Sequence, residues 1–388
     1  MAAPRSTALI RDAMEALQAG DAVRALALLD KAGALDPTDA DVPLNRALAL
    51  RMRGDLTGAL RALDAALAIE PYSLLALLSK GALVEQLGRP RDAAKIFRNA
   101  LKIAPPEAAA PPHLKPVLAH ARQAVSKNTA AMNAYLRAQT AAARAKHGDA
   151  DLSRFDECLD ILSGAKKAYV QEPVFLTFPK LPPLTFYPRR HFPWMAALEA
   201  QADVIVDELV TQLKIYWDKF HPYMQIPAGA PLNQWAALNK SPDWSSLHLW
   251  RDGAKVAANC ALFPQTAAIL DGLPMADQPG FAPTAMFSVL QPRTAIPPHT
   301  GSSNTRLICH LPLIIPDGCR FRVGNDTRAW VMGESFVFDD TIEHEAWNDS
   351  DQLRAVLIFD VWNPLLTQAE RELVSAMTTA LNAYDAGG

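Results

Sequence analysis

The sequence contains no run of about 18 apolar residues, the length that a membrane-spanning helix requires. Net charge is also small, because 38 basic and 41 acidic residues leave −3, which gives no electrostatic footprint for nucleic acid or an anionic membrane. The four cysteines show neither metal-ligand spacing nor a disulfide framework. The first residues lead into a charged amphipathic segment and not into an apolar signal core, so we expect a cytoplasmic protein.

Half of the residues are apolar and 20% are charged, which is typical of a globular protein. A chain of 388 residues is long enough for two or three domains with buried cores. We expect three parts. Residues 1–106 are predicted to form helical repeats, 107–167 a helical cap or linker, and 168–388 a domain rich in β-strands.

The first part repeats with a period of 34 residues. Gly20, Gly54 and Gly88 keep this spacing, an alanine follows each glycine by five residues, and prolines at 37, 71 and 105 close the units. The pattern resembles the tetratricopeptide repeat, a helix–turn–helix unit. Each unit buries its apolar face only by stacking on a neighbour, so we expect an all-α solenoid of three units. The repeats either recruit a peptide or partner protein in a groove or act as a scaffold without a ligand.

The later parts change from helical to strand-like patterns. Residues 115–147 and 152–167 have helical spacing, whereas 174–188 reads as a strand punctuated by prolines. The chain closes with a helix opened by the capping box Thr367–Glu370. Short strands between these segments predict a small two-sheet barrel. The expected strands are 241–251, 283–290, 304–313, 319–323, 328–331, 334–338 and 354–361.

Two histidines, His299 and His344, lie at the ends of short β-like runs, and Arg354 opens another apolar strand ten residues after the second. This order suits a non-haem Fe(II) oxygenase that uses 2-oxoglutarate, because such iron is held on one face by imidazoles and a carboxylate. The distal carboxylate of 2-oxoglutarate needs a buried cation, and an arginine guanidinium can bind a carboxylate through two parallel hydrogen bonds. The usual ligand carboxylate is missing. Gly301 stands two residues after His299, so a water would take that place.

Further motifs surround these residues. Pro-His-Thr-Gly occupies 298–301, Phe-Asp-Asp followed by Glu-His-Glu-x-Trp occupies 338–347, and Asp-Val-Trp-x-Pro occupies 360–364. Together with His310 they resemble the catalytic domain of the aspartyl/asparaginyl β-hydroxylase family over roughly 168–388. The resemblance implies a double-stranded β-helix (a jelly-roll, cupin-like barrel) with flanking helices.

The resemblance also implies roles for individual residues. His299 and His344 match the Fe(II) ligands, and Ser288 and Arg354 match the residues that hold the distal carboxylate of 2-oxoglutarate. The resemblance also implies Trp244 and His310 as cosubstrate-binding residues, and Cys309 is added because it lies close to the proposed site. For Cys309, burial as a small apolar side chain is the alternative interpretation.

One position departs from the family pattern. The family often has an arginine two residues before the position of His310, and this chain has Ile308. Arg306 lies two residues further back on the same strand face and is a candidate to replace that arginine. Asp339 and Asp340 could supply a missing carboxylate, but a turn at a strand end is the simpler interpretation of this pair.

The resemblance therefore implies a dioxygenase dependent on Fe(II) and 2-oxoglutarate that hydroxylates the β-carbon of aspartyl or asparaginyl residues in a peptide or protein. The repeats would recruit substrate or a partner protein, and neither nucleic acid nor a membrane span is expected. With one ligand fewer, we expect weak metal retention. Two alternatives stay open. One is a hydroxylase of a lipid acyl chain or small metabolite. The other is a catalytically inactive adaptor, for which Ile308 is the main argument.

Overall fold

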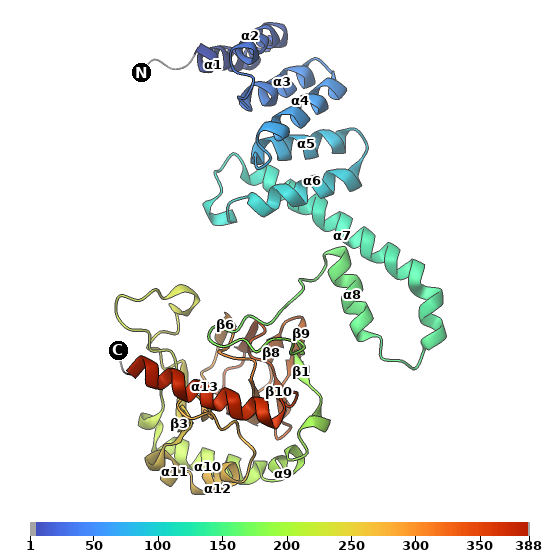
Figure 1. Ribbon diagram of the computed structural model, residues 1–388. Coiled ribbons are helices and arrows are strands. Elements are labelled where there is room, and N and C mark those ends of the chain that lie inside the picture. The colour runs from blue at the N-terminus through green and yellow to red at the C-terminus, as the bar shows by residue number, and fades with distance from the viewer. Residues whose placement is uncertain (1–4, 387–388) are drawn as a thin grey trace. The chain divides into compact units, whose positions relative to one another are not determined.

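The computed structural model describes residues 5–386, which divide into two compact units between Lys166 and Lys167 (Figure 1). The first unit is built from helices and the second around β-sheets, so the predicted order of an all-α part before a β-rich part is confirmed. Residues 107–166, expected as a cap or linker, form one unit with the repeats. The main helices of the first unit are α1 (Arg5–Gln18), α2 (Ala22–Leu35), α3 (Asp41–Met52), α4 (Leu56–Ile69), α5 (Leu74–Gln86), α6 (Pro90–Ile103), α7 (Lys115–Arg144) and α8 (Ser153–Ser163).

Helices α1 to α6 form three antiparallel pairs that stack on one another, as the period of 34 residues predicts. Gly20, Gly54 and Gly88 follow the first helix of each pair and have φ values of +82°, +79° and +77°. Glycine adopts this left-handed conformation without steric cost, so it allows the sharp reversal into the second helix. The alanines five residues later pack between helices and are buried: Ala25, Ala59 and Ala93.

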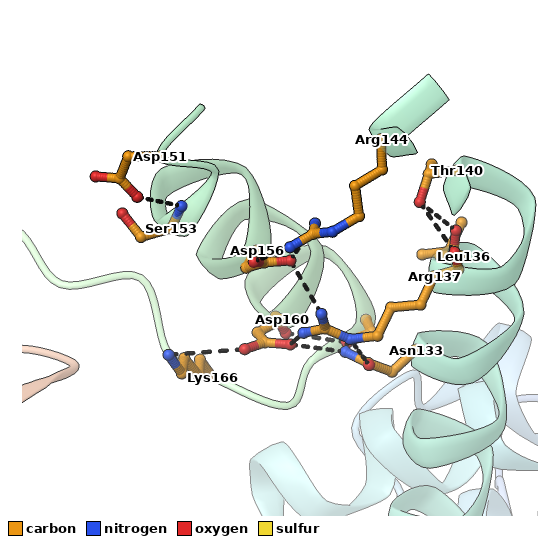
Figure 2. A network of polar contacts seen from close by, with 11 residues as sticks. Asn133, Leu136, Arg137, Thr140, Arg144, Asp151, Ser153, Asp156, Asp160 and Lys166 are labelled. Atoms are coloured by element: carbon orange, nitrogen blue, oxygen red, sulfur yellow. Dashed lines mark hydrogen bonds and ion pairs between the residues drawn. The ribbon is translucent and has the colours of Figure 1, made fainter. Parts of the chain in front are cut away.

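Helix α7 covers the apolar face that the third repeat leaves. Leu118 and Ala121 are fully buried against Phe97 of α6. The later part of α7 holds α8 through a network of charged and polar groups (Figure 2). Arg137 donates to Asp156 at 3.0 Å and to Asp160 at 2.7 Å. Further contacts are the double hydrogen bond from Arg144 to Asp156 and the bond from Asn133 to Asp160.

Within the described residues, the strands of the second unit form a larger and a smaller antiparallel sheet. The larger has the order β1-β10-β7-β12-β5-β3-β2, with β4 paired to β3, and the smaller has the order β6-β11-β8-β9. Their bounds are β1 (Phe186–Tyr187), β2 (His221–Pro222), β3 (Trp244–Arg251), β4 (Ala254–Lys255), β5 (Ala285–Leu290), β6 (Thr294–His299), β7 (Arg306–Ile314), β8 (Cys319–Val323), β9 (Asp326–Ala329), β10 (Phe336–Phe338), β11 (His344–Asn348) and β12 (Arg354–Trp362).

Each face of the larger sheet has its own core. The outer face packs on four helices (Figure 1). Its core joins residues such as Leu209 and Phe263 of the helical layer to Phe287 and Phe359 of the sheet. The inner face meets the smaller sheet. This two-sheet arrangement confirms the predicted jelly-roll-like barrel with flanking helices. The covering helices are α9 (Met195–Glu199), α10 (Ala202–Ile215), α11 (Ala257–Leu262) and α12 (Pro264–Asp271).

The last helix, α13 (Gln368–Ala386), begins at the predicted capping box. The backbone N–H of Thr367 donates to the Glu370 carboxylate at 2.8 Å, and the Glu370 N–H donates back to the Thr367 hydroxyl at 3.3 Å. This exchange satisfies donors that the first helical turn leaves unpaired. Val374 on α13 packs on Trp362 at the end of β12, so the helix covers the end of this central strand.

The prediction of a strand over 174–188 is wrong for most of its length. Only Phe186–Tyr187 forms a strand, β1, which pairs with β10. Proline lacks the N–H that a ladder requires, and the prolines at 179, 182 and 183 explain why regular pairing fails between them. The predicted strand at 328–331 is shifted, since β9 covers Asp326–Ala329.

Candidate active site

A cavity of about 310 Å³ lies between the two sheets. Strands of the larger sheet supply one wall and strands of the smaller sheet the other, because alternate residues of each strand face inward. Every predicted metal or cosubstrate residue except Cys309 lines this cavity. These are Trp244, Ser288, His299, His310, His344 and Arg354.

His299 ends β6 and His344 begins β11, and the two residues are direct partners across this strand pair. Their ring centroids are 4.0 Å apart. The Nδ1 atom of His299 lies 2.7 Å from the Pro297 carbonyl oxygen, and that of His344 lies 3.1 Å from the Ile342 carbonyl oxygen. A carbonyl only accepts, so each Nδ1 carries the proton and each Nε2 keeps a lone pair.

Both imidazoles are neutral at physiological pH. Burial lowers the pKa of His299 to about 3, and the neighbouring His344 adds to the effect. Burial likewise lowers the pKa of His344 to about 4. Neutral imidazoles with fixed Nδ1–H groups are the form that binds a metal ion, so the pair suits a divalent metal without prior loss of protons.

Gly301 lies two residues after His299, where a ligand carboxylate would usually stand. A Cβ atom at this position would overlap the carboxylate of Asp340, so the backbone here has space only for glycine. Asp340 is buried, and its Oδ2 lies 3.3 Å from Arg306 Nη1, while its Oδ1 has no partner among the described residues. Within residues 5–386, no group of three or more His, Cys, Asp or Glu side chains is placed to hold a metal ion.

Asp340 therefore does more than the predicted turn. Asp339 alone has that role, because its Oδ1 accepts from the backbone N–H of Thr341 at 3.0 Å. Asp340 belongs to a buried ionic group in which Arg306 Nη1 also lies 3.2 Å from Oδ1 of Asp360. Burial raises the pKa of Asp360 to about 6, and Arg306 opposes that rise.

Arg354 is 1% exposed, and no carboxylate within the described part of the chain pairs with it. Its Nη1 reaches the Ser288 carbonyl oxygen at 3.4 Å and the Ser288 hydroxyl at 3.5 Å, and its guanidinium lies 4.7 Å from the centre of the Trp330 ring. Burial lowers the pKa of Arg354 to about 10. A buried cation without a counter-ion is unfavourable, so this end of the cavity suits an anionic ligand.

The neighbours of Arg354 are held by further hydrogen bonds. Trp244 Nε1 donates to the Ser288 hydroxyl at 3.1 Å, and Tyr223 stacks on the Trp244 ring with centroids 4.1 Å apart. Trp330 Nε1 donates to Nδ1 of His310 at 3.4 Å, which leaves the proton of the neutral ring on Nε2. Burial, then Arg354, hold the pKa of His310 well below its usual value.

Cys309 is a correction. Successive residues of a strand face opposite sides, so Cys309 points away from the cavity when Ile308 and His310 line it. Its thiol packs in the core between the larger sheet and the covering helices, and burial raises its pKa. The alternative interpretation, a buried small side chain, therefore holds for this residue.

A strap formed by residues 171–178 braces the loops around both histidines. The backbone N–H of Glu172 donates to the Thr341 carbonyl at 2.7 Å, and that of Val174 donates to the Gly301 carbonyl at 3.0 Å. The Gln171 side chain donates to Asp339 at 2.6 Å. The segment thus joins the loop after β6 to the loop before β11, beside the two paired histidines.

Comparison with known sequences agrees with this geometry. The sequence profile described as "Aspartyl/Asparaginyl beta-hydroxylase" matches residues 199–364. The "Ornithine lipid ester-linked acyl 2-hydroxylase" of Rhizobium tropici is 32% identical over 201 residues, which span 51% of this chain and 67% of that protein. The chain belongs to the aspartyl/asparaginyl β-hydroxylase family.

Other members of the aspartyl/asparaginyl β-hydroxylase family are similar over the same region. The "Aspartyl/asparaginyl beta-hydroxylase" of Mus musculus is 35% identical over 187 residues, covering 48% of this chain and 25% of that protein. The human protein of this name is 34% identical over 187 residues, covering 48% of this chain and 24% of that protein. The chain thus spans only about a quarter of these two relatives.

The repeats are similar to solved domains at low identity. The "First TPR of Spaghetti (RPAP3) bound to HSP90 peptide SRMEEVD" is 20% identical with a TM-score of 0.28, covering 31% of this chain and 96% of that one. The "Arabidopsis OM64 TPR domain" is 22% identical with a TM-score of 0.28, covering 32% of this chain and 95% of that one.

Several cavity residues were missed by sequence reasoning. Trp235 packs edge-on against His299 with centroids 5.0 Å apart, yet it comes from an irregular segment without a motif. Asp360 is part of the Asp-Val-Trp-x-Pro motif, but its position in the cavity was not predicted. It alternates with Ile358 and Arg354 along β12, and this period of two indicates a side chain that points inward. Within residues 5–386, no helix is long and apolar enough to cross a membrane.

Proposed function

We propose that this protein is a dioxygenase dependent on Fe(II) and 2-oxoglutarate. The observation that carries the proposal is Arg354, a buried guanidinium without a carboxylate partner among the described residues, in the same cavity as two neutral imidazoles. A cation costs several kcal/mol to bury unpaired, so an anionic ligand is the simplest reason for its presence. The distal carboxylate of 2-oxoglutarate is such an anion.

The residues fit the implied groups. His299 and His344 would hold Fe(II) through Nε2, since each Nδ1 proton is bonded to a backbone carbonyl. Arg354 and the Ser288 hydroxyl would hold the distal carboxylate, with Trp244 fixing the orientation of Ser288. When bound, iron and 2-oxoglutarate together activate dioxygen for attack on an unactivated C–H bond.

The chain's own side chains supply position and protection from water. Trp235 and Trp244 close one side of the His299 ring. Phe321 and Phe338 lie against the His344 ring. These aromatic groups exclude water, which strengthens the charge interactions between Arg354 and an anionic ligand.

The acceptor that we propose is the β-carbon of an aspartyl or asparaginyl residue in a peptide or protein. The membership of the chain in the aspartyl/asparaginyl β-hydroxylase family supports this acceptor. The helical repeats would recruit the peptide or a partner protein, and we propose that this occurs in the cytoplasm. A second candidate is an acyl chain, because the Rhizobium tropici relative is named as an acyl 2-hydroxylase and several cavity residues are aliphatic or methionine.

Anaerobic titration with Fe(II) and 2-oxoglutarate tests the proposal. The expected result is a visible metal-to-ligand charge-transfer band in the wild type that both His344→Ala and Arg354→Ala lose. Arg320→Ala is the matched control, because Arg320 is an exposed arginine of β8 that pairs with Asp349 and lies over the Trp347 ring, outside the cavity lining, and this variant should keep the band. A wild type without a band at any iron concentration refutes the proposal. A band that survives Arg354→Ala refutes the assignment of the distal carboxylate to Arg354.

A further inference from the structure

The cavity has two chemically different ends. Arg354 and Asp360 stand at the two ends of the inward face of β12, six residues or roughly 20 Å apart along the strand. Ser288 is near the Arg354 end, because it pairs with Val356. Ile308 is at the other end, directly opposite Asp360. The histidine loops reach this second end, since Gly301 contacts Asp340.

At the second end of the cavity, one arginine faces two carboxylates, so no positive charge is left over there. Among the residues of the described chain that line the cavity, the arginines are Arg306 and Arg354. Arg306 lies between Asp340 and Asp360, at 3.3 Å and 3.2 Å. Arg354 is distant from this group and, in the proposed function, binds the cosubstrate. No cavity-lining arginine or lysine in residues 5–386 is therefore left to pair with a carboxylate of the acceptor.

The bound groups do not change this balance. A divalent metal and dianionic 2-oxoglutarate cancel in charge, as do the two arginines and the two aspartates. The third carboxylate of the cavity lining, Glu345, is paired with Arg322. An acceptor carboxylate would add one buried negative charge without a partner beside two existing carboxylates. Such a charge is strongly disfavoured in a cavity shielded from water.

Uncharged polar groups are available instead. Thr284, Thr300 and Ser302 line the cavity, and a hydroxyl group can donate or accept a hydrogen bond. Asp340 also lines the cavity, and its Oδ1 has no hydrogen-bond partner within the described residues, so this oxygen is an unused acceptor for an N–H group. A carboxamide has both a donor and an acceptor and carries no charge, so it satisfies such a surface.

We infer that the acceptor is an asparaginyl residue, whose side chain enters as a neutral carboxamide, and that the cavity rejects an aspartyl carboxylate. This inference rests on the proposed function and narrows its substrate. Ile308 is the specificity-determining residue. It lies between Arg306 and His310 on the inward face of β7, where an added cation would face both the histidine loops and the second end of the cavity.

The experiment uses the full chain with Fe(II) and 2-oxoglutarate under anaerobic conditions. Three probes are titrated at pH 7.5 while the charge-transfer band and ligand-detected NMR are followed: the N-acetyl N-methylamides of asparagine, aspartate and leucine. The asparagine probe should bind at least about tenfold more tightly than the aspartate probe, the ratio that corresponds to roughly 1.4 kcal/mol. Ile308→Arg should reduce or reverse this ratio, and Ile308→Gln, which adds length without charge, should preserve it.

Each outcome bears on the inference. Equal or tighter binding of the aspartate probe overturns it, and tighter binding of the leucine probe overturns it in favour of an aliphatic acceptor. A band that forms but responds to none of the probes also overturns the carboxamide assignment, while the proposed function stands. If no band forms with wild type, the proposed function itself fails. Retention of the band in Ile308→Arg shows that this variant is folded and loaded.

Discussion

The two cavity arginines should respond in opposite directions to the same substitution. Arg354 is fully buried and unpaired within the described residues, and burial lowers its pKa from 12.5 to about 10. That shift corresponds to ~3 kcal/mol of penalty on the charged form, at 1.36 kcal/mol per unit. Arg354→Met keeps the length of the side chain and removes the charge. We therefore expect the free energy of unfolding, measured without metal or cosubstrate, to rise by roughly 1–3 kcal/mol.

Arg306→Met should have the reverse effect. Removal of this guanidinium leaves Asp340 and Asp360 buried without their cation. Breaking a buried ion pair from one side costs roughly 3–5 kcal/mol, so this variant should be strongly destabilised. The comparison is controlled, because both residues are arginines of the same cavity and both are replaced by methionine.

Urea unfolding followed by tryptophan fluorescence measures the free energy of unfolding of the β-rich unit in both variants. All eight tryptophans lie after Lys166, so the signal reports the β-rich unit and not the repeats. With the metal site saturated in both proteins, 2-oxoglutarate at about 100 times its dissociation constant should then add about 2.7 kcal/mol to the wild type and nothing to Arg354→Met. A loss of stability of more than about 1 kcal/mol in unliganded Arg354→Met would refute the reasoning, because removal of an unpaired buried charge should not be this costly.

Four further outcomes are expected. Gly301→Ala should abolish Mn(II) binding measured by electron paramagnetic resonance, because its methyl group overlaps the Asp340 carboxylate, whereas a variant that still binds would show that the loop can move. Mn(II) binding at pH 7, followed by calorimetry in buffers of different ionisation enthalpy, should release almost no protons, because burial lowers the pKa of the two site histidines to about 3 and about 4. For the same reason the free energy of unfolding should fall as pH drops from 6.5 toward 4. In this range the unfolded chain binds protons that the folded chain does not. Arg137→Ala should increase hydrogen exchange in α8 at low salt, and 1 M salt should do the same to the wild type, so unchanged exchange in both would contradict the role of the network in Figure 2.

The repeats could be predicted from the sequence because their information is local. The glycine at position 20 and its counterparts need a left-handed conformation, and the buried alanines need close helix packing, so both leave a periodic trace. That His299 and His344 lie together in one cavity was also predictable, since each histidine stands at a strand terminus in a short motif. By contrast, the strand predicted over 174–188 failed, because apolar residues between prolines do not reveal whether a partner edge is available.

The ionic group at the cavity could not be derived from sequence. Asp340 and Asp339 are adjacent and chemically identical, yet Asp339 caps a turn and Asp340 pairs with Arg306 of the neighbouring strand β7. Only the pairing of β7 with β10 and β12 brings these residues together. Cys309 is the opposite case. Its position beside His310 in the sequence suggested that it lines the site, but the pleat of the strand points its side chain to the core on the other face of the sheet.

The strap at 171–178 determines where the chain can be truncated or extended without disturbing the barrel. The boundary between the two units lies at Lys166, only a few residues before Gln171 and Glu172 begin to hold the histidine loops. A gene fragment that starts at Lys167 keeps the strap, whereas one that starts at Pro179 encodes every strand of the barrel yet loses the brace between its two histidine loops. Insertions should follow the same rule. Added residues between Ala165 and Lys167 lengthen a tether, but the same residues placed after Gln171 would shift the strap out of register with the loops it joins.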